Sequence, residues 1–312
     1  MRIGDELRLS GTGRQYAAMK IGVMGAGAVG CYYGAMLAKA GNDVTLVGRE
    51  TFVAAVCAEG LTLEANGTRV TVPARATTDP DALNEADLIL FCVKSTDTAV
   101  AGRQLVRSHC PVLSLQNGVD NPERLAAVLG RPAVPVAVYV AAEMAGPAQV
   151  KHLGRGDLIM GRFPGSEEVA SALAAAGIPV RVSDDVVTAQ WQKLITNCAY
   201  NALSAITRLP YGRLVQVPGV TQAMTVVATE ATAVGRALGV TLPELDMEPI
   251  LEIAVSMAGQ FSSTAQDLAR HKPTEIDYLN GYVVRQGLAL GIPTPANQLL
   301  ATLVRALESV PA

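Results

Sequence analysis

The chain lacks several features that mark common classes of protein. It has 5 cysteines in 312 residues with no CxxC pair, and its 3 histidines, His109, His152 and His271, lie far apart. This pattern argues against a disulfide-stapled secreted domain and against a local metal-binding motif. The basic residues form no run, and a net charge of -3 with a pI near 5.7 argues against a nucleic-acid partner. No apolar stretch is long enough to span a bilayer.

What is present favours a large apolar core. Hydrophobic residues make up 50% of the chain, and its length favours about two domains. The odd number and wide spacing of the cysteines favour reduced, buried thiols in a cytoplasmic protein: Cys31, Cys57, Cys92, Cys110 and Cys198. Residues 1–18 have no apolar h-region and are not a secretory signal, so we interpret them as a non-core extension, with a short ordered arm as the alternative.

Short apolar runs predict the strands of an α/β domain. The expected strands are Lys20–Met24, Asp43–Val47, Leu88–Val93, Val112–Gln116 and Ala133–Val140, with extra strands at Val70–Val72 and Gln149–Arg162. A helix is expected over Gly27–Ala40, with Gly41 as its C-cap. Strands alternating with helical stretches predict a parallel, doubly wound sheet of the Rossmann type.

The pattern changes near residues 183–185, and a helical period dominates from Val187 to the end. Helical segments are expected at Val220–Leu238 and Tyr278–Leu290, and the long segment Pro249–Leu268 has no strand-like alternation. We therefore predict a non-core extension at 1–18, a dinucleotide-binding domain at 19–185 and an all-helical substrate and catalytic domain at 186–312.

A glycine-rich loop follows the first expected strand and opens the first expected helix. It is the GxGxxG sequence Gly25-Ala26-Gly27-Ala28-Val29-Gly30. Gly25 permits the tight turn, Gly27 lets the backbone approach a pyrophosphate, and Gly30 lets helix and strand pack closely. The helix N-terminus supplies N–H donors to the phosphates. The context predicts a dinucleotide site, with a ligand-free structural turn as the alternative.

Three further positions lie at the carboxyl ends of expected strands, where ligands of doubly wound sheets bind. Arg49 at the tip of the second strand suits a 2′-phosphate and favours NADPH, whereas Glu50, one residue on, would take a ribose hydroxyl if the register shifts. Lys94 and Asn117 end the next two strands. Taken singly, Lys94 is more often a solvated charge and Asn117 a turn residue.

Polar residues interrupt an apolar helical segment, Trp191–Ala205. Lys193, Asn197 and Asn201 follow one another at intervals of four and therefore lie on one face. A lysine ammonium can polarise a ketone and donate the proton that its reduction needs. The alternative is that these groups satisfy neighbouring loops. Glu275, two residues after Pro273, reads by itself as a first-turn acid of a helix.

The sequence resembles the ketopantoate reductase (2-dehydropantoate 2-reductase) family from Met19 to about Leu299. The resemblance rests on Gly25–Gly30, Gln116-Asn117-Gly118, Trp191-Gln192-Lys193-Leu194 with Asn197 and Asn201, Ser262-Ser263 with Gln266-Asp267, and Thr274–Gly281. It implies that Lys193 is the general acid, and that Glu275 orients Lys193 and holds the substrate. It further implies that Asn197 and Asn201 bind the substrate hydroxyl, that Ser263 binds the carboxylate, and that Arg49, Lys94, Asn117 and Ala142 line the NADPH site.

The expected activity is the NADPH-dependent reduction of a 2-keto acid, foremost 2-dehydropantoate to pantoate in pantothenate biosynthesis. The expected partner is this small molecule, with no nucleic acid, membrane or metal, and a homodimer is left open. Tyr211 and Gln260 stand where some members of the family have asparagine, which puts 2-dehydropantoate itself in question. The alternatives are a reductase of another branched 2-keto acid, an opine-type dehydrogenase, and a non-catalytic NADPH sensor.

Overall fold

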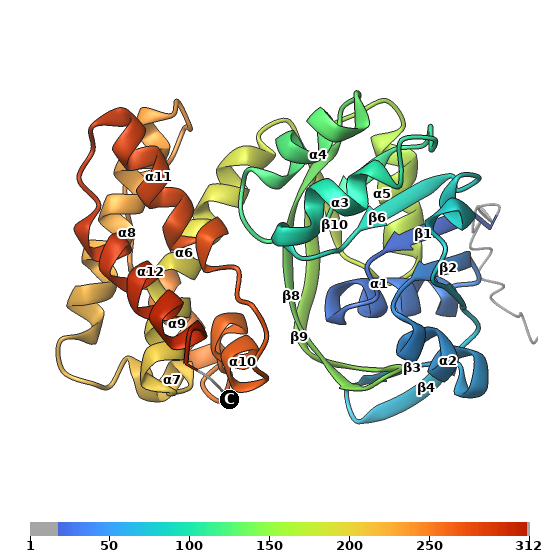
Figure 1. Cartoon of the computed structure of the whole chain (residues 1–312), viewed down its shortest axis with the longest axis horizontal. Helices are drawn as coiled ribbons and strands as arrows, with labels where there is room; N and C mark the ends of the chain where they lie inside the picture. The colour runs from blue at the N-terminus through green and yellow to red at the C-terminus, as the bar shows by residue number, and fades with distance from the viewer. Residues whose placement is uncertain (1–17, 311–312) are drawn as a thin grey trace, which may run out of the picture.

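The computed structural model describes residues 18–310, so nearly all of the predicted extension at residues 1–18 lies outside the described part. The chain forms two halves that lie side by side, a sheet flanked by helices and a helical bundle (Figure 1). The change from strands to helices falls between residues 183 and 186, and we keep the division at residues 185 and 186 as a proposal.

The described residues of the first half form the strands and five α-helices. The strands are β1 (Lys20–Met24), β2 (Asp43–Val47), β3 (Leu61–Ala65), β4 (Thr68–Val72), β5 (Arg75–Thr77), β6 (Leu88–Phe91), β7 (Val112–Ser114), β8 (Val134–Gly146), β9 (Gln149–Gly161) and β10 (Val180–Ser183). The helices are α1 (Ala28–Lys39), α2 (Glu50–Glu59), α3 (Thr98–Arg103), α4 (Asn121–Leu129) and α5 (Ser166–Ala175), with 3₁₀ turns η1 (Pro80–Leu83) and η2 (Ser95–Asp97).

Six strands form the parallel, doubly wound part of the sheet. Their order is β5-β2-β1-β6-β7-β8, and every neighbouring pair in this run is parallel. This is the 3-2-1-4-5-6 order of dinucleotide-binding folds, in which the chain reverses direction across the sheet between β1 and β6. The predicted Rossmann-type sheet followed by a helical half is confirmed.

The sheet as a whole is mixed, because further strands extend its parallel part. β9 runs antiparallel to β8, and the hairpin β3–β4 joins beyond β9, so the described residues form a 10-stranded sheet. β8 also runs to Gly146, well past the predicted end at Val140. The strands of a long hairpin pair with each other and contact other elements of the fold. Their lengths therefore depend on tertiary contacts rather than on the local sequence pattern.

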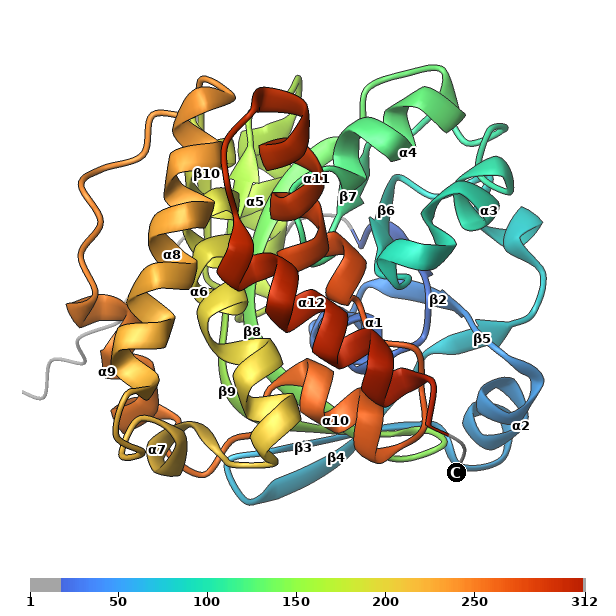
Figure 2. The ribbon, with the colours of Figure 1, turned by 60° about the vertical axis from the view of Figure 1, so that its left-hand side comes forward.

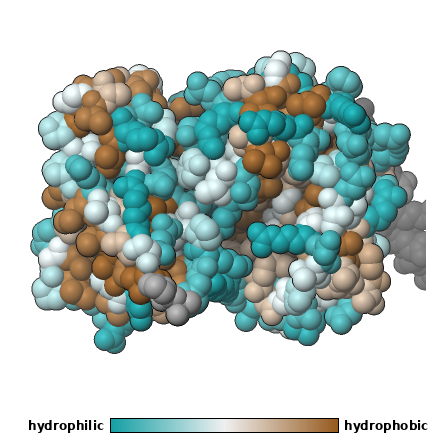
Figure 3. Space-filling model, in the orientation of Figure 1, coloured by the Kyte–Doolittle hydropathy of each residue, from teal (hydrophilic) through white to brown (hydrophobic). Residues whose placement is uncertain are grey.

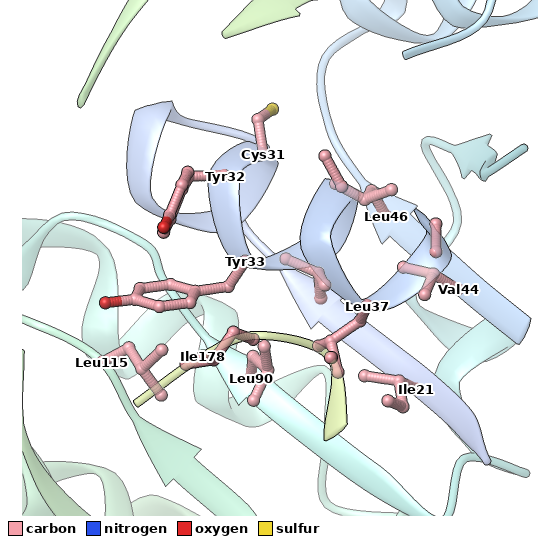
Figure 4. Close-up of a cluster of buried hydrophobic side chains, with 14 of the residues drawn as sticks. Ile21, Cys31, Tyr32, Tyr33, Leu37, Val44, Leu46, Leu90, Leu115 and Ile178 are labelled. Carbon is pink, nitrogen blue, oxygen red and sulfur yellow. The ribbon is translucent and has the colours of Figure 1, made fainter. Parts of the chain in front are cut away.

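The core of this half is built around α1. The helix buries eight of its twelve residues, and it packs against β1, β2, β3, β8 and β9. Tyr33 and Leu37 of α1 point among Ile21, Leu90, Leu115 and Ile178 in Figure 4. Because α1 is fixed in this core, the loop that precedes it is held at the carboxyl end of β1.

The described residues of the second half form helices joined by loops, with no strand among them. It consists of α6 (Val186–Thr207), α7 (Tyr211–Leu214), α8 (Val220–Ala237), α9 (Glu248–Ser256), α10 (Ser263–Ala269), α11 (Asn280–Leu290) and α12 (Pro295–Glu308), with the 3₁₀ turn η3 (Ile276–Tyr278). The long helix α6 begins where the Asp185 side chain accepts a hydrogen bond from Thr188 N–H at 3.2 Å. It packs against α8, α10 and α12, as Figure 2 shows from the side.

Residues 249–268 do not form one continuous helix. α9 ends at Ser256 and α10 begins at Ser263, with a non-helical segment between them. The Ser262 side chain accepts a hydrogen bond from Ala265 N–H at 3.0 Å and so caps α10. This break turns Gln260, Phe261 and Ser263 toward the boundary between the two halves.

Two sequence expectations concern the whole chain. All five cysteines are free thiols. Cys31 and Cys198 are buried, but Cys57 is exposed and Cys92 and Cys110 are partly exposed, which corrects the expectation of buried thiols. Within residues 18–310, none of the helices combines the length and the apolar character that crossing a membrane requires.

Candidate active site

The glycine-rich loop has the geometry that a dinucleotide requires. Gly25 has φ of +105°, and a Cβ there would lie 2.8 Å from the backbone nitrogen of Val93, so only glycine fits. Gly27 is the N-cap of α1, and a Cβ placed on it would meet nothing within 4 Å. The open space at Gly27 and the unpaired N–H groups of the first turn of α1 fit a pyrophosphate.

The reversal of strand order gathers the predicted cofactor residues at one edge of the sheet. Gly25 follows β1, Lys94 follows β6 after two residues, and Asn117 lies three residues beyond β7. β1, β6 and β7 are parallel, so their carboxyl ends lie at the same edge. A crevice outside this edge is where doubly wound sheets bind nucleotides.

Arg49 lies at the tip of β2, as predicted. It is the N-cap of α2, and its side chain is exposed, with no hydrogen bond or ion pair to any described residue. Glu50 begins α2 and is exposed as well. Which of the two contacts the adenosine ribose stays a prediction.

Lys94 faces the helical half. Its ammonium donates to the carbonyl of Pro273 at 2.7 Å and pairs with the Asp267 carboxylate at 2.9 Å. Asp267 belongs to α10, and Pro273 lies between α10 and η3. Lys94 therefore joins the two halves at the cofactor edge, a contact that its position after a strand did not predict.

Lys193 projects from α6 into the boundary between the halves. Its ammonium donates to the Asn117 side-chain oxygen at 2.9 Å and to the backbone carbonyl of Val138 in β8. Burial lowers the pKa of Lys193 to about 8, with a smaller lowering by the Arg155 guanidinium and an opposing rise from the Glu275 carboxylate. An ammonium group whose pKa lies this close to neutral pH can donate a proton at ordinary pH.

Glu275 reaches Lys193 through Asn117 rather than directly. One carboxylate oxygen accepts from the backbone N–H and the hydroxyl of Ser95, at 2.9 and 2.7 Å. The other accepts from the Asn117 side-chain N–H at 3.2 Å, while the oxygen of the same amide faces Lys193. The three side chains form a continuous hydrogen-bonded series across the two halves.

The polar residues on one face of α6 lie along a cleft. Asn197 and Asn201 line it together with Lys193, and the Asn201 side-chain N–H donates to the Ser263 hydroxyl at 3.4 Å. Ser262 is used differently: its hydroxyl donates to the Asn201 carbonyl at 3.0 Å and caps α10. Of the two adjacent serines, Ser263 is therefore the one exposed to the cleft.

The cleft measures about 230 Å³ and is lined by both halves, on the boundary where the surface is hollowed in Figure 3. Asn117, Ala142, Lys193, Asn197, Asn201 and Ser263 line it, so the structure brings these predicted residues together. Glu275 and Lys94 are not among the lining residues, although Glu275 contacts Asn117, which is. The described residues hold no cluster of side chains able to bind a metal ion.

Arg155 was not predicted as a site residue. It lies at a bulge where the β8–β9 register shifts, with φ of +59°, and its guanidinium stands 4.3 Å from the centre of the Tyr139 ring. Asp157 pairs with it at 2.8 Å. Arg155 and Lys193 are the charged side chains among the described residues that line the cleft, so both favour an anionic ligand. Ser95 was also missed, although it directly follows Lys94 at the strand end.

A Rossmann-type sheet edge that meets a partly buried lysine is typical of an oxidoreductase that uses a nicotinamide cofactor. Comparison with known proteins gives the particular family. Residues 21–165 match the family model "Ketopantoate reductase PanE/ApbA", and residues 185–308 match its C-terminal counterpart. The chain belongs to the ketopantoate reductase family, which confirms the resemblance in its sequence.

Individual relatives cover nearly the whole chain. A 2-dehydropantoate 2-reductase of Pyrococcus horikoshii is 32% identical over 94% of this chain and 98% of its own. The crystal structure of a PanE/ApbA family ketopantoate reductase from Ralstonia eutropha is 53% identical with a TM-score of 0.89, covering 93% and 98%. D-mandelate dehydrogenase, solved with NADH and anilino(oxo)acetate, is 25% identical with a TM-score of 0.86, covering 93% and 98%.

Proposed function

We propose that the protein uses NADPH to reduce 2-keto acids to 2-hydroxy acids, with 2-dehydropantoate as the substrate that yields pantoate for pantothenate biosynthesis. The observation that carries the proposal is the hydrogen-bonded series Lys193–Asn117–Glu275, whose first two members line a cleft beside a Rossmann-type sheet. The family's curated relatives carry the name of this reaction.

The protein's part in the reaction is to hold the keto acid and supply a proton. The nicotinamide cofactor, when bound, supplies the hydride. The Lys193 ammonium polarises the keto oxygen and donates the proton to it, while Asn117 and the Val138 carbonyl fix the ammonium in place. Asn197 and Asn201 bind the substrate hydroxyl, and Ser263 binds the carboxylate. Glu275 orients Lys193 through the Asn117 amide and contributes to holding the substrate.

The cofactor site combines the loop with residues at neighbouring strand ends. Gly25, Ala26, Gly27, Ala28, Val29 and Gly30 surround the pyrophosphate, Arg49 pairs with the 2′-phosphate, and Lys94, Asn117 and Ala142 complete the nicotinamide end. The open approach at Gly27 and the Arg49 guanidinium, which pairs with none of the described residues, support this arrangement. Five free thiols support the cytoplasmic location that we propose with it.

Arg49 provides the test of cofactor choice. Arg49→Ala should weaken NADPH binding about ten- to a hundredfold, the loss expected for one charge-assisted contact. NADH binding should hardly change, because NADH has no 2′-phosphate. Calorimetric titration of both cofactors measures the effect, with Glu50→Gln as the control that should leave NADPH affinity intact. Equal affinity of the native protein for NADH and NADPH would contradict the assignment.

Steady-state oxidation of NADPH in the presence of 2-dehydropantoate tests the reaction. Turnover to pantoate is the expected result. NADPH binding without turnover of 2-dehydropantoate or any other 2-keto acid would instead favour a non-catalytic sensor. The retention of Lys193 in a cleft argues against that alternative, because a sensor needs no proton donor.

The pH dependence should report the Lys193 ammonium. The protonated form is the active acid, and its pKa is lowered to about 8, so kcat/KM should be level below this pH. Above it, kcat/KM should fall by about a factor of ten per pH unit, because the fraction of protonated lysine falls in that proportion. Pre-steady-state and steady-state rates over a pH series measure this limb.

Arg155→Gln tests the same assignment by changing the pKa of Lys193. The Arg155 guanidinium lowers the pKa of Lys193, so its removal should move the descending limb to higher pH. Arg155 is half-exposed, which screens the effect and keeps the shift small. A profile that stays level well above pH 8 in the native protein would exclude Lys193 as the acid.

A further inference from the structure

The lining of the cleft carries two positive charges, and within residues 18–310 no aspartate or glutamate lines it. Both cations lie near one aromatic ring. The Arg155 guanidinium stands 4.3 Å from the centre of the Tyr139 ring, and the Lys193 ammonium stands 5.9 Å from the same centre. In the proposed reaction the ammonium faces the keto oxygen. The guanidinium is therefore the remaining cation with which an anionic group of the substrate can pair.

The backbone at Arg155 is held in an uncommon conformation. Its φ of +59° belongs to the left-handed region, which residues other than glycine seldom adopt. The His152 ring donates from Nε2 to the Arg155 carbonyl at 2.5 Å. Gly156 follows with φ of +135°, and a Cβ there would lie 2.5 Å from the Tyr32 hydroxyl. Conformations that the surrounding structure enforces in this way are concentrated at functional sites.

The side chain of Arg155 is oriented by Asp157. Its Nε and Nη2 donate to the two oxygens of the Asp157 carboxylate, at 3.1 and 2.8 Å. Its Nη1 donates to none of the residues that the structure describes. A guanidinium has a second edge, formed by Nη1 and Nη2, that matches the two oxygens of a carboxylate. Asp157 thus holds one edge of Arg155 and leaves the other edge for a ligand.

We propose that Arg155 is a specificity-determining residue, whose free edge binds the carboxylate of the 2-keto acid and so selects acids over neutral ketones. This inference rests on the proposed reductase function and deepens it. The keto and carboxylate groups are bonded neighbours, and the two cations share one ring, so a small keto acid can reach both. The Ser263 hydroxyl, from the other half, can donate to the same carboxylate, but only Arg155 supplies charge.

Arg155→Gln should raise KM for 2-dehydropantoate about tenfold and hardly change kcat. The carboxylate takes no part in hydride transfer, so its contact is as strong in the bound keto acid as in the transition state. About half of the Arg155 side chain is exposed, which places the effect at the lower end for charged hydrogen bonds. Burial lowers the pKa of Lys193 to about 8, so the rates are compared well below this pH, where the lysine is protonated.

2-Dehydropantolactone, the neutral ring ester of the same acid, is the comparison substrate. The ratio of kcat/KM for the acid to that for the lactone should fall about tenfold in Arg155→Gln, because only the acid loses an ion pair. Arg155→Lys keeps the charge without the fork and should give an intermediate ratio. Arg162→Gln is the matched control. It removes an exposed arginine just beyond β9 that pairs with Asp184 and Glu167, and it should leave the ratio unchanged.

Oxamate, an isostere of the 2-keto acid core, tests the contact without turnover. Calorimetric titration into the native protein with NADPH bound should show tighter binding of oxamate than of neutral oxamide. Arg155→Gln should remove most of this difference, whereas Ser263→Ala should keep most of it, because a hydroxyl carries no charge. Circular dichroism verifies that each variant is folded.

The outcomes separate this proposal from the reductase function on which it rests. Reduction of neither substrate would overturn the reductase function itself. Reduction of 2-dehydropantoate with a KM and a substrate ratio that Arg155→Gln leaves unchanged would overturn the role of Arg155 alone. Equal losses on acid and lactone would also overturn it, because they would mean a disturbed bulge. A preference for oxamate that Ser263→Ala removes and Arg155→Gln keeps would assign the carboxylate to the helical half.

Discussion

Lys193→Ala should lower kcat by about 10²–10⁴-fold, the range that positioned proton donors contribute. kcat/KM should fall with it, because the contact between ammonium and keto oxygen strengthens as charge develops on that oxygen. NADPH binding should persist, since the glycine loop and Arg49 lie on the other half of the molecule. Stopped-flow and steady-state rates, with calorimetry for the cofactor, measure these quantities.

Two further variants separate chemistry from packing at Lys193. Gln192→Ala changes an exposed neighbour on α6 and should leave the rates unchanged. Added alkylammonium ions should restore part of the activity of Lys193→Ala, because they can supply the missing proton donor in the vacated space. Near-normal kcat in Lys193→Ala would remove the residue from the mechanism.

Much of the fold was predictable because its signals are local. The strands β1, β2, β6 and β7 are short apolar runs, and the loop before α1 has a spacing that only a strand–turn–helix unit explains. The Rossmann-type order then follows from strands that alternate with helices. The lengths of β8 and β9 were not predictable, because they depend on pairing between distant segments and on bulges.

The residues of the site, like the elements of the fold, were predictable only where the signal is local. Helical periodicity placed Lys193, Asn197 and Asn201 on one face, and all three line the cleft. The hydrogen bond from Asn117 to Glu275 joins residues 158 positions apart, so no local pattern could predict it. The family resemblance associated Glu275 with Lys193 but did not associate it with Asn117. Arg155 depends on a left-handed backbone conformation at a bulge, for which an arginine in the sequence gives no signal.

The Asn117 amide lies between Glu275 and Lys193, and this gives the Glu275 carboxylate a specific role. Asn117 can present its oxygen to Lys193 only while its N–H has an acceptor, and that acceptor is Glu275. The carboxylate also raises the pKa of Lys193 and so keeps the ammonium protonated. Glu275 thus acts on the proton donor twice, once through orientation and once through charge.

Glu275→Gln should therefore lower kcat/KM about ten- to a hundredfold, the cost of losing hydrogen bonds to a charged group. The introduced amide presents N–H toward Asn117 if its oxygen keeps the Ser95 contacts, so the Asn117 amide must turn and offer its own N–H to the ammonium. Loss of the negative charge should also move the descending limb of the pH profile below about 8, because the Glu275 carboxylate raises the pKa of Lys193. Rates across a pH series measure both effects.

Asp277→Asn is the matched control, because Asp277 belongs to the same motif but pairs with Arg305 at 2.8 Å on the outer side of the helical half. It should leave the pH profile unchanged and cost at most about 1 kcal/mol of stability, as exposed ion pairs do. A downward shift of the limb in Glu275→Gln alone distinguishes an electrostatic role from a structural one, since a merely loosened fold would lower the rate at every pH alike. A Glu275→Gln limb that stays at the native position would mean that the carboxylate does not act on Lys193, and the series Lys193–Asn117–Glu275 would then serve only to join the two halves.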